Sequence, residues 1–186
     1  MSSWKNPVGF VAAQAVRLVA AASTAPERPL LQPELELLRQ VYADALDYRR
    51  VRIRAPVHGL LGISRRAFVI ENTLFIPPEF LPLSPAVLVH ELCHVWQHQH
   101  GGHAYIADSL HAQLLGDGYR LAKGLAEGKR WGALNCEQQA TLLEEAWGQG
   151  AFAGGRLMIK GVDRTRELEA ALIELRAGRG AGFDTG

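Results

Sequence analysis

Cysteine is scarce in this chain, and neither sign of charge dominates it. The two cysteines, Cys93 and Cys136, are too few for a disulfide-stapled scaffold, and as thiols they suit a reducing cytoplasm. Lysine and arginine number 20 against 19 acidic residues, which leaves a formal charge of +1, and neither sign is gathered into a block. We therefore expect neither nucleic acid nor an anionic membrane surface as a partner.

Long uninterrupted hydrophobic runs are also missing. The apolar stretch from Val8 to Ala22 contains Gln14 and Arg17. It is shorter than the roughly 18 residues that a membrane span needs. A polar and a charged residue within it favour an amphipathic surface helix over a signal peptide.

The length allows one hydrophobic core. With 186 residues, of which 48% are hydrophobic, the chain is too short for two ordinary domains. We predict an N-terminal helix and a proline-containing linker over residues 1–32, a single domain over 33–178, and a flexible glycine-rich tail over 179–186.

Hydrophobic spacing predicts a mostly helical α+β domain with a small β-sheet. β-rich runs precede the central helix, and Pro77 and Pro78 end the last of them, because proline cannot donate to a sheet ladder. We predict strands at 51–54, 67–70 and 73–76, with the last as an exposed edge strand. The predicted helices cover residues 35–46, 84–100, 106–115, 137–147 and 164–177.

The central helix contains the pattern HExxH. Ser84 followed by Pro85 is a strong helix start, and two glycines after residue 100 favour its end. Positions four apart on a helix lie about 40° apart around the axis and about 6 Å along it, so His90 and His94 can bind one ion. Glu91 lies beside them.

This residue set suits zinc chemistry. Zinc lowers the pKa of its bound water to about 7, and a neighbouring carboxylate can take a proton from that water as it attacks a peptide carbonyl. The alternative is a chance HExxH on a histidine-rich helix. A capped helix that follows a β-hairpin and carries apolar neighbours favours the zinc interpretation, with Glu91 as general base.

The stretch from Val89 to Gln97, followed by Gly101, resembles a known family. It is similar to the short zincin-like proteins associated with Rhs and Vgr elements of bacterial type VI secretion, and to the core metallopeptidase-like domain of contractile injection systems. The resemblance extends from about residues 48–53 to residues 135–140, about half of the chain. It implies a zincin-like fold, a Zn²⁺ cofactor and metallopeptidase activity of the gluzincin type, with Glu137 as third metal ligand. It also implies protein or peptide substrates, secretion-system or toxin proteins as partners, and a cytoplasmic location or export through a secretion apparatus.

Other third ligands compete with Glu137. His100 stands where the metzincin pattern has its last histidine, but the glycine that lets the chain turn back to the metal is replaced by Gln97. In a continued helix, His100 faces away from the ion. Glu137 begins a predicted helix of its own and is favoured, and Glu144 and Glu145, two turns later, are further candidates.

Two more features carry alternatives. Tyr119 could stabilise an oxyanion over the cleft, or it could be a buried tyrosine with a satisfied hydroxyl. Cys93 and Cys136 each precede a proposed ligand, so they could form a regulatory disulfide or lie as two buried thiols. The function is interpreted first as a zinc metallopeptidase, and the alternative is a non-catalytic, zinc-stabilised accessory module of a secretion apparatus. A third option is a peptidase that cuts only its own chain or a fused partner.

Overall fold

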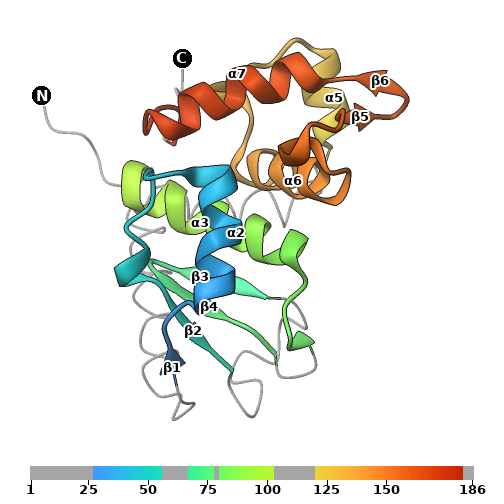
Figure 1. Cartoon of the computed structure of the whole chain (residues 1–186). Helices are drawn as coiled ribbons and strands as arrows, with labels where there is room; N and C mark the ends of the chain where they lie inside the picture. The colour runs from blue at the N-terminus through green and yellow to red at the C-terminus, as the bar shows by residue number, and fades with distance from the viewer. Residues whose placement is uncertain (1–26, 56–66, 78–79, 103–119, 182–186) are drawn as a thin grey trace, which may run out of the picture.

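The structure is a computed structural model that describes residues 27–55, 67–77, 80–102 and 120–181 (Figure 1). These residues form an α+β arrangement that is mostly helical and has a small sheet, as the sequence predicts. The helices are α2 (Gln32–Tyr42), α3 (Pro85–Gly101), α5 (Leu121–Ala126), α6 (Cys136–Gly148) and α7 (Thr165–Arg176). The strands of the main sheet are β1 (Glu27–Arg28), β2 (Arg52–Arg54), β3 (Phe68–Ile70) and β4 (Thr73–Phe75).

The order of strands in the sheet is β1-β2-β4-β3. The three predicted strands are confirmed to within a residue at each end, and β3 and β4 form the predicted hairpin. The prediction that 73–76 is an edge strand is wrong. β2 pairs in parallel with β4, so β4 has a partner on both sides, and the outer strands among the described residues are β1 and β3.

α2 ends earlier than its apolar spacing predicts. Pro33 lies in its first turn as expected, but Ala43 has a φ of 49°, which a right-handed helix does not allow. The chain therefore turns after Tyr42, and Leu46 still reaches the core from the loop that follows.

α3 begins and ends where the sequence predicts. The Ser84 hydroxyl accepts a hydrogen bond from the Val87 backbone N–H at 3.2 Å, which caps the first turn. Gly102 closes the helix with a φ of 70°, a conformation that costs glycine little. α3 crosses over the sheet and forms the centre of the molecule (Figure 1).

The C-terminal helices lie on the other side of α3 from the sheet (Figure 1). α6 and α7 are the predicted helices at 137–147 and 164–177, and α6 makes the most extensive contact with α3 of any described element. α5 and the hairpin of β5 (Met158–Ile159) with β6 (Val162–Asp163) were not predicted, since runs this short carry little periodicity. Short 3₁₀ turns cover Tyr48–Arg50, Trp131–Ala133 and Ala151–Ala153.

The segment after α7 packs against the core. The indole of Trp131 donates to the Arg179 carbonyl at 3.1 Å, and the Gln139 amide donates to the Gly180 carbonyl at 2.8 Å. The first residues of the predicted tail are therefore held by hydrogen bonds. The predicted N-terminal helix, the predicted helix at 106–115 and residues 182–186 lie outside the described residues.

The buried polar side chains of the described residues lie on two helices. Apolar residues fill the core between α3, the sheet and the surrounding helices. Within the described ranges, the buried polar and charged side chains all lie on α3 or α6, and they are Glu91, His94, Gln97, Glu137, Gln138 and Gln139. No described helix has the length and apolar character needed to span a bilayer.

Candidate metal centre

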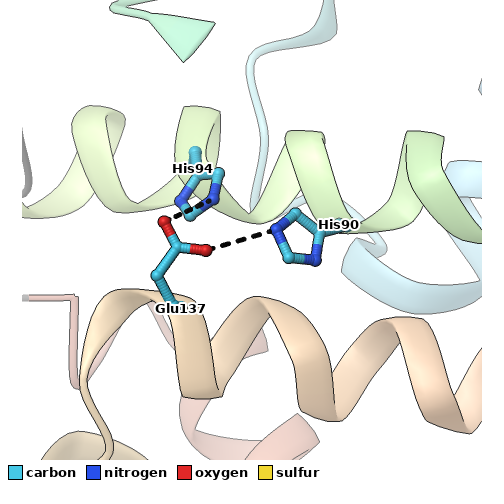
Figure 2. Close-up of side chains that lie close together, drawn as sticks. All are labelled: His90, His94 and Glu137. Carbon is cyan, nitrogen blue, oxygen red and sulfur yellow. Dashed lines mark ion pairs between the residues drawn. The ribbon is translucent and has the colours of Figure 1, made fainter. Parts of the chain in front are cut away.

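His90, His94 and Glu137 come together at the interface of α3 and α6 (Figure 2). Each offers one ligand atom, and these atoms all lie within 4.8 Å of one another. His90 Nε2 lies 3.5 Å from Glu137 Oε2, and His94 Nε2 lies 3.7 Å from Glu137 Oε1. These separations are long for hydrogen bonds, and they match the distance of about 3 to 4 Å between two ligands of one zinc ion.

Local structure explains why the three side chains meet. His90 and His94 lie one turn apart on α3, so both rings project from the same face. Glu137 lies in the first turn of α6, which Asn135 starts by accepting from the Gln138 backbone N–H at 2.8 Å. The two helices run antiparallel, and Glu137 points into the gap between the two rings (Figure 2).

The ring nitrogens that point away from the cluster have polar partners. His90 Nδ1 lies 2.8 Å from Glu144 Oε2, and His94 Nδ1 lies 2.8 Å from Gln97 Oε1. Partners of this kind hold a metal-binding imidazole in one orientation and direct Nε2 at the ion. Glu144 therefore orients His90, a candidate ligand, and Glu145 is exposed.

Burial and charge set the protonation of the cluster. Burial lowers the pKa of His90, but its interactions with Glu137 and Glu144 outweigh burial and raise that pKa to about 10. Burial lowers the pKa of His94, which is neutral near pH 7 as a result. In the metal-free chain, His90 is thus protonated between the carboxylates of Glu137 and Glu144. A divalent cation that displaced this proton would be attracted by the same two carboxylates.

Glu91 lies beside the cluster without a partner for one of its oxygens. Its side chain is 6% exposed, and its Oε2 makes no hydrogen bond within the described residues. Burial raises its pKa to about 7, against the opposing effect of His90. A buried carboxylate oxygen that lacks a partner is costly unless water or another ligand occupies the site.

The donor set fits zinc. Two imidazole Nε2 atoms and one carboxylate form the His₂Glu combination of three-ligand catalytic zinc sites, which keep a fourth position for water. The residues present therefore fit a zinc ion.

Other predicted site residues are placed elsewhere. His100 Nε2 lies 2.7 Å from the Ala45 carbonyl, so the ring turns toward the loop after α2 and away from the cluster. Tyr119 lies outside the described residues. Cys93 and Cys136 are both buried, and no disulfide joins them in the described part of the chain.

Three neighbours of the cluster were missed or assigned another role. Glu144 was considered only as a ligand, although its spacing of two turns from Glu137 places it on the same face of α6. Gln97 was read only as a helix-continuing residue, and Gln139 was not considered. A polar amide within an otherwise apolar helix face is the signal that points to such buried partners.

Comparison with known proteins links the chain to type VI secretion. No protein-family model matches it. It is 28% identical over 166 residues to the type VI secretion system spike protein VgrG2b of Pseudomonas aeruginosa, in an alignment that covers 78% of this chain and 16% of that protein. The chain thus spans about a sixth of the length of this relative.

A solved structure shows the same fold. The effector domain of Pseudomonas aeruginosa VgrG2b matches with a TM-score of 0.53 and 21% sequence identity, and the match covers 78% of this chain and 89% of that one. The Vgr-related part of the resemblance seen in the sequence is therefore confirmed. The chain is similar in sequence to a type VI spike protein and in fold to its effector domain.

Proposed function

We propose that this protein is a zinc-dependent metallopeptidase with a zincin-like fold of the gluzincin type. One observation supports it above all: Glu91, whose Oε2 is buried without a partner, lies beside a His₂Glu cluster. A purely structural zinc site needs no carboxylate at position 91. A buried carboxylate oxygen without a partner lowers stability, and a part in the reaction explains why the chain keeps it.

The geometry supports a role for each residue. His90, His94 and Glu137 would hold the ion, and zinc, when bound, would acidify a water molecule and polarise the carbonyl of the scissile peptide bond. Glu91 accepts a proton from the attacking water and passes it to the amine that leaves, so that one peptide bond and one water yield a carboxylate and an amine. Burial raises the pKa of the Glu91 carboxyl, which makes this carboxylate a stronger base.

The sheet offers a way to align a peptide substrate. β1 and β3 are the two outer strands of the described sheet, and β3 packs against α3. An extended peptide that pairs with an edge strand is held by its backbone, which leaves a carbonyl to reach the metal. The substrate-aligning role predicted for 73–76 therefore passes to β3, since β4 is paired on both sides.

The similarity to VgrG2b supports a biological setting. The relative is a spike protein, and the solved structure that matches is an effector domain. We propose that this chain acts on protein or peptide substrates in connection with a type VI secretion or toxin system, and that it is exported through that apparatus from the cytoplasm.

The test pairs metal analysis with a proteolysis screen. The purified protein is expected to contain about one zinc per chain and to cleave at least one unfolded protein in a broad panel. Glu91→Gln is expected to keep the zinc and to lose cleavage by at least about 100-fold, the usual contribution of a general base. Zinc retained without cleavage by the parent would favour the non-catalytic module, and a Glu91→Gln variant as active as the parent would refute the role of Glu91.

A further inference from the structure

Two buried amides connect the metal centre to the backbone behind it. Gln97 on α3 and Gln139 on α6 are both 0% exposed. Gln97 Oε1 lies 2.8 Å from His94 Nδ1, and Gln97 Nε2 lies 2.9 Å from Gln139 Oε1. A continuous line of hydrogen bonds therefore runs from a candidate zinc ligand through two side chains.

The far end of this line fixes its direction. Gln139 Nε2 lies 2.8 Å from the Trp131 carbonyl and 2.8 Å from the Gly180 carbonyl. A backbone carbonyl can only accept, so the atom of Gln139 that faces both must be the NH₂ group. Gln139 Oε1 is therefore the atom that faces Gln97, and it can only accept as well.

The same reasoning applies to the next amide. Gln97 Nε2 meets Gln139 Oε1 and also the Cys136 carbonyl, at 3.0 Å. Both are acceptors, so this atom must donate, and Gln97 Oε1 must face His94. An amide oxygen has no hydrogen to give, and His94 Nδ1 therefore has to carry one.

We propose that Gln97 and Gln139 are positioning residues that hold His94 in the tautomer with hydrogen on Nδ1, so that the Nε2 lone pair faces the metal position. The inference rests on the metal site of the proposed function. Gln97 also joins the two ligand-bearing helices, because the Cys136 carbonyl precedes Glu137 in the first turn of α6.

The chemistry requires an amide at position 97. His90 is oriented by a carboxylate, Glu144, which needs only to accept. A carboxylate at position 97 would accept from His94 equally well, but its second oxygen would face the Cys136 carbonyl and Gln139 Oε1, two acceptors. Glutamine satisfies both ends, because it accepts on one side and donates on the other.

The first measurement is made on the metal-free parent protein. Long-range ¹H–¹⁵N correlation spectra of histidine-labelled protein distinguish the two neutral tautomers and the imidazolium form. His94, assigned from the His94→Ala variant, is expected to carry its hydrogen on Nδ1. A His94 found with hydrogen on Nε2 would overturn the proposal without reference to zinc or catalysis.

The second measurement is zinc affinity, by competition with a chromophoric chelator. Gln97→Met is expected to weaken zinc binding by about 10- to 100-fold, the usual effect of removing such a partner, and to leave His94 a mixture of tautomers. Gln139→Met removes a residue one hydrogen bond further from His94. It is expected to change zinc affinity and the His94 tautomer ratio in the same direction as Gln97→Met, but by a smaller amount. It also keeps the test valid should Gln97→Met fail to fold.

The matched control is Gln99→Met. Gln99 is also on α3, but its amide bonds Asn72 Oδ1 at 2.7 Å and the backbone of Asp47, on the side of the sheet. It is expected to leave zinc affinity and the His94 tautomer unchanged. Equal zinc affinity and tautomer in Gln97→Met and the parent would refute the proposal. If zinc affinity depends on Gln97 but the parent protein has no peptidase activity, the positioning role of Gln97 is supported and only the proposed peptidase function is rejected.

Discussion

α3 packs against its neighbours in two contrasting ways. Toward α2 the contact is mostly apolar, with Leu38 and Val41 fully buried on α2. A hydrogen bond from the Tyr42 hydroxyl to the Val89 carbonyl also joins the two helices. Toward α6 the contact contains the His₂Glu cluster and two buried glutamines. Apolar contacts tolerate small shifts, whereas buried polar groups are costly unless each finds its partner. We infer that the α2 side supplies stability, and that the α6 side spends part of it to fix ligand geometry.

The largest effect is expected from the apolar side. Leu38→Ala removes a fully buried side chain and leaves a cavity, so the free energy of unfolding is expected to fall by about 2 to 5 kcal/mol. Zinc affinity of the folded protein is expected to stay within about twofold. Denaturant unfolding and chelator competition measure the two quantities. A variant that loses zinc as well would show that the two sides of α3 are not separable.

A change on the α6 side of α3 should instead reduce zinc affinity. Glu137→Ala removes a carboxylate ligand and is expected to weaken zinc binding by about 100-fold or more, since even the partner of a ligand contributes 10- to 100-fold. His100→Ala serves as the control, because His100 bonds the Ala45 carbonyl away from the cluster. Loss of zinc in His100→Ala with retention in Glu137→Ala would move the third ligand to α3.

Removal of zinc should destabilise the protein through the α6 side. With zinc at about 100 times its dissociation constant, binding stabilises the folded state by about 2.7 kcal/mol, and a chelator is expected to remove that amount. The melting temperature should therefore fall by several degrees. In Glu137→Ala the chelator should have little effect, and a parent indifferent to chelator would show that zinc does not support this fold.

Acidity should have opposite effects on the metal-free and zinc-bound forms. The pKa of His90 is raised to about 10 from 6.5, so its pairing with the carboxylates stabilises the metal-free fold fully below pH 6.5 and is lost as pH rises toward 10. Zinc must displace that proton, so its affinity is expected to rise by about tenfold per pH unit between pH 6.5 and 8. Chelator competition at three pH values tests this, and an affinity independent of pH would show that His90 binds zinc without losing a proton.

The sequence predicts the elements better than their arrangement. The capped helix α3 and the hairpin of β3 and β4 follow from local signals, namely Ser84, the terminal glycines and runs of β-branched residues. That β4 lies inside the sheet follows from its parallel pairing with β2, and no local signal encodes that contact.

The same distinction applies to the metal centre. The HExxH spacing is local, so His90 and His94 can be paired from the sequence alone. Glu137 came from resemblance to a family, because its approach depends on the packing of α6 against α3. The roles of Gln97, Gln139 and Glu144 depend on contacts between these helices, and single-sequence spacing does not reveal the partners of an amide.

The hydrogen bonds that fasten the segment after α7 have a consequence for biosynthesis. The Leu175 carbonyl, in the last turn of α7, accepts from Trp96, and the carbonyls of Arg179 and Gly180 accept from Trp131 and Gln139. A ribosome that has released only α3 has exposed two imidazoles without their carboxylate. Under the proposed zinc site, tight binding would have to wait until α6 has docked on α3 and the segment after α7 has packed behind it, so an emerging chain would compete poorly for zinc.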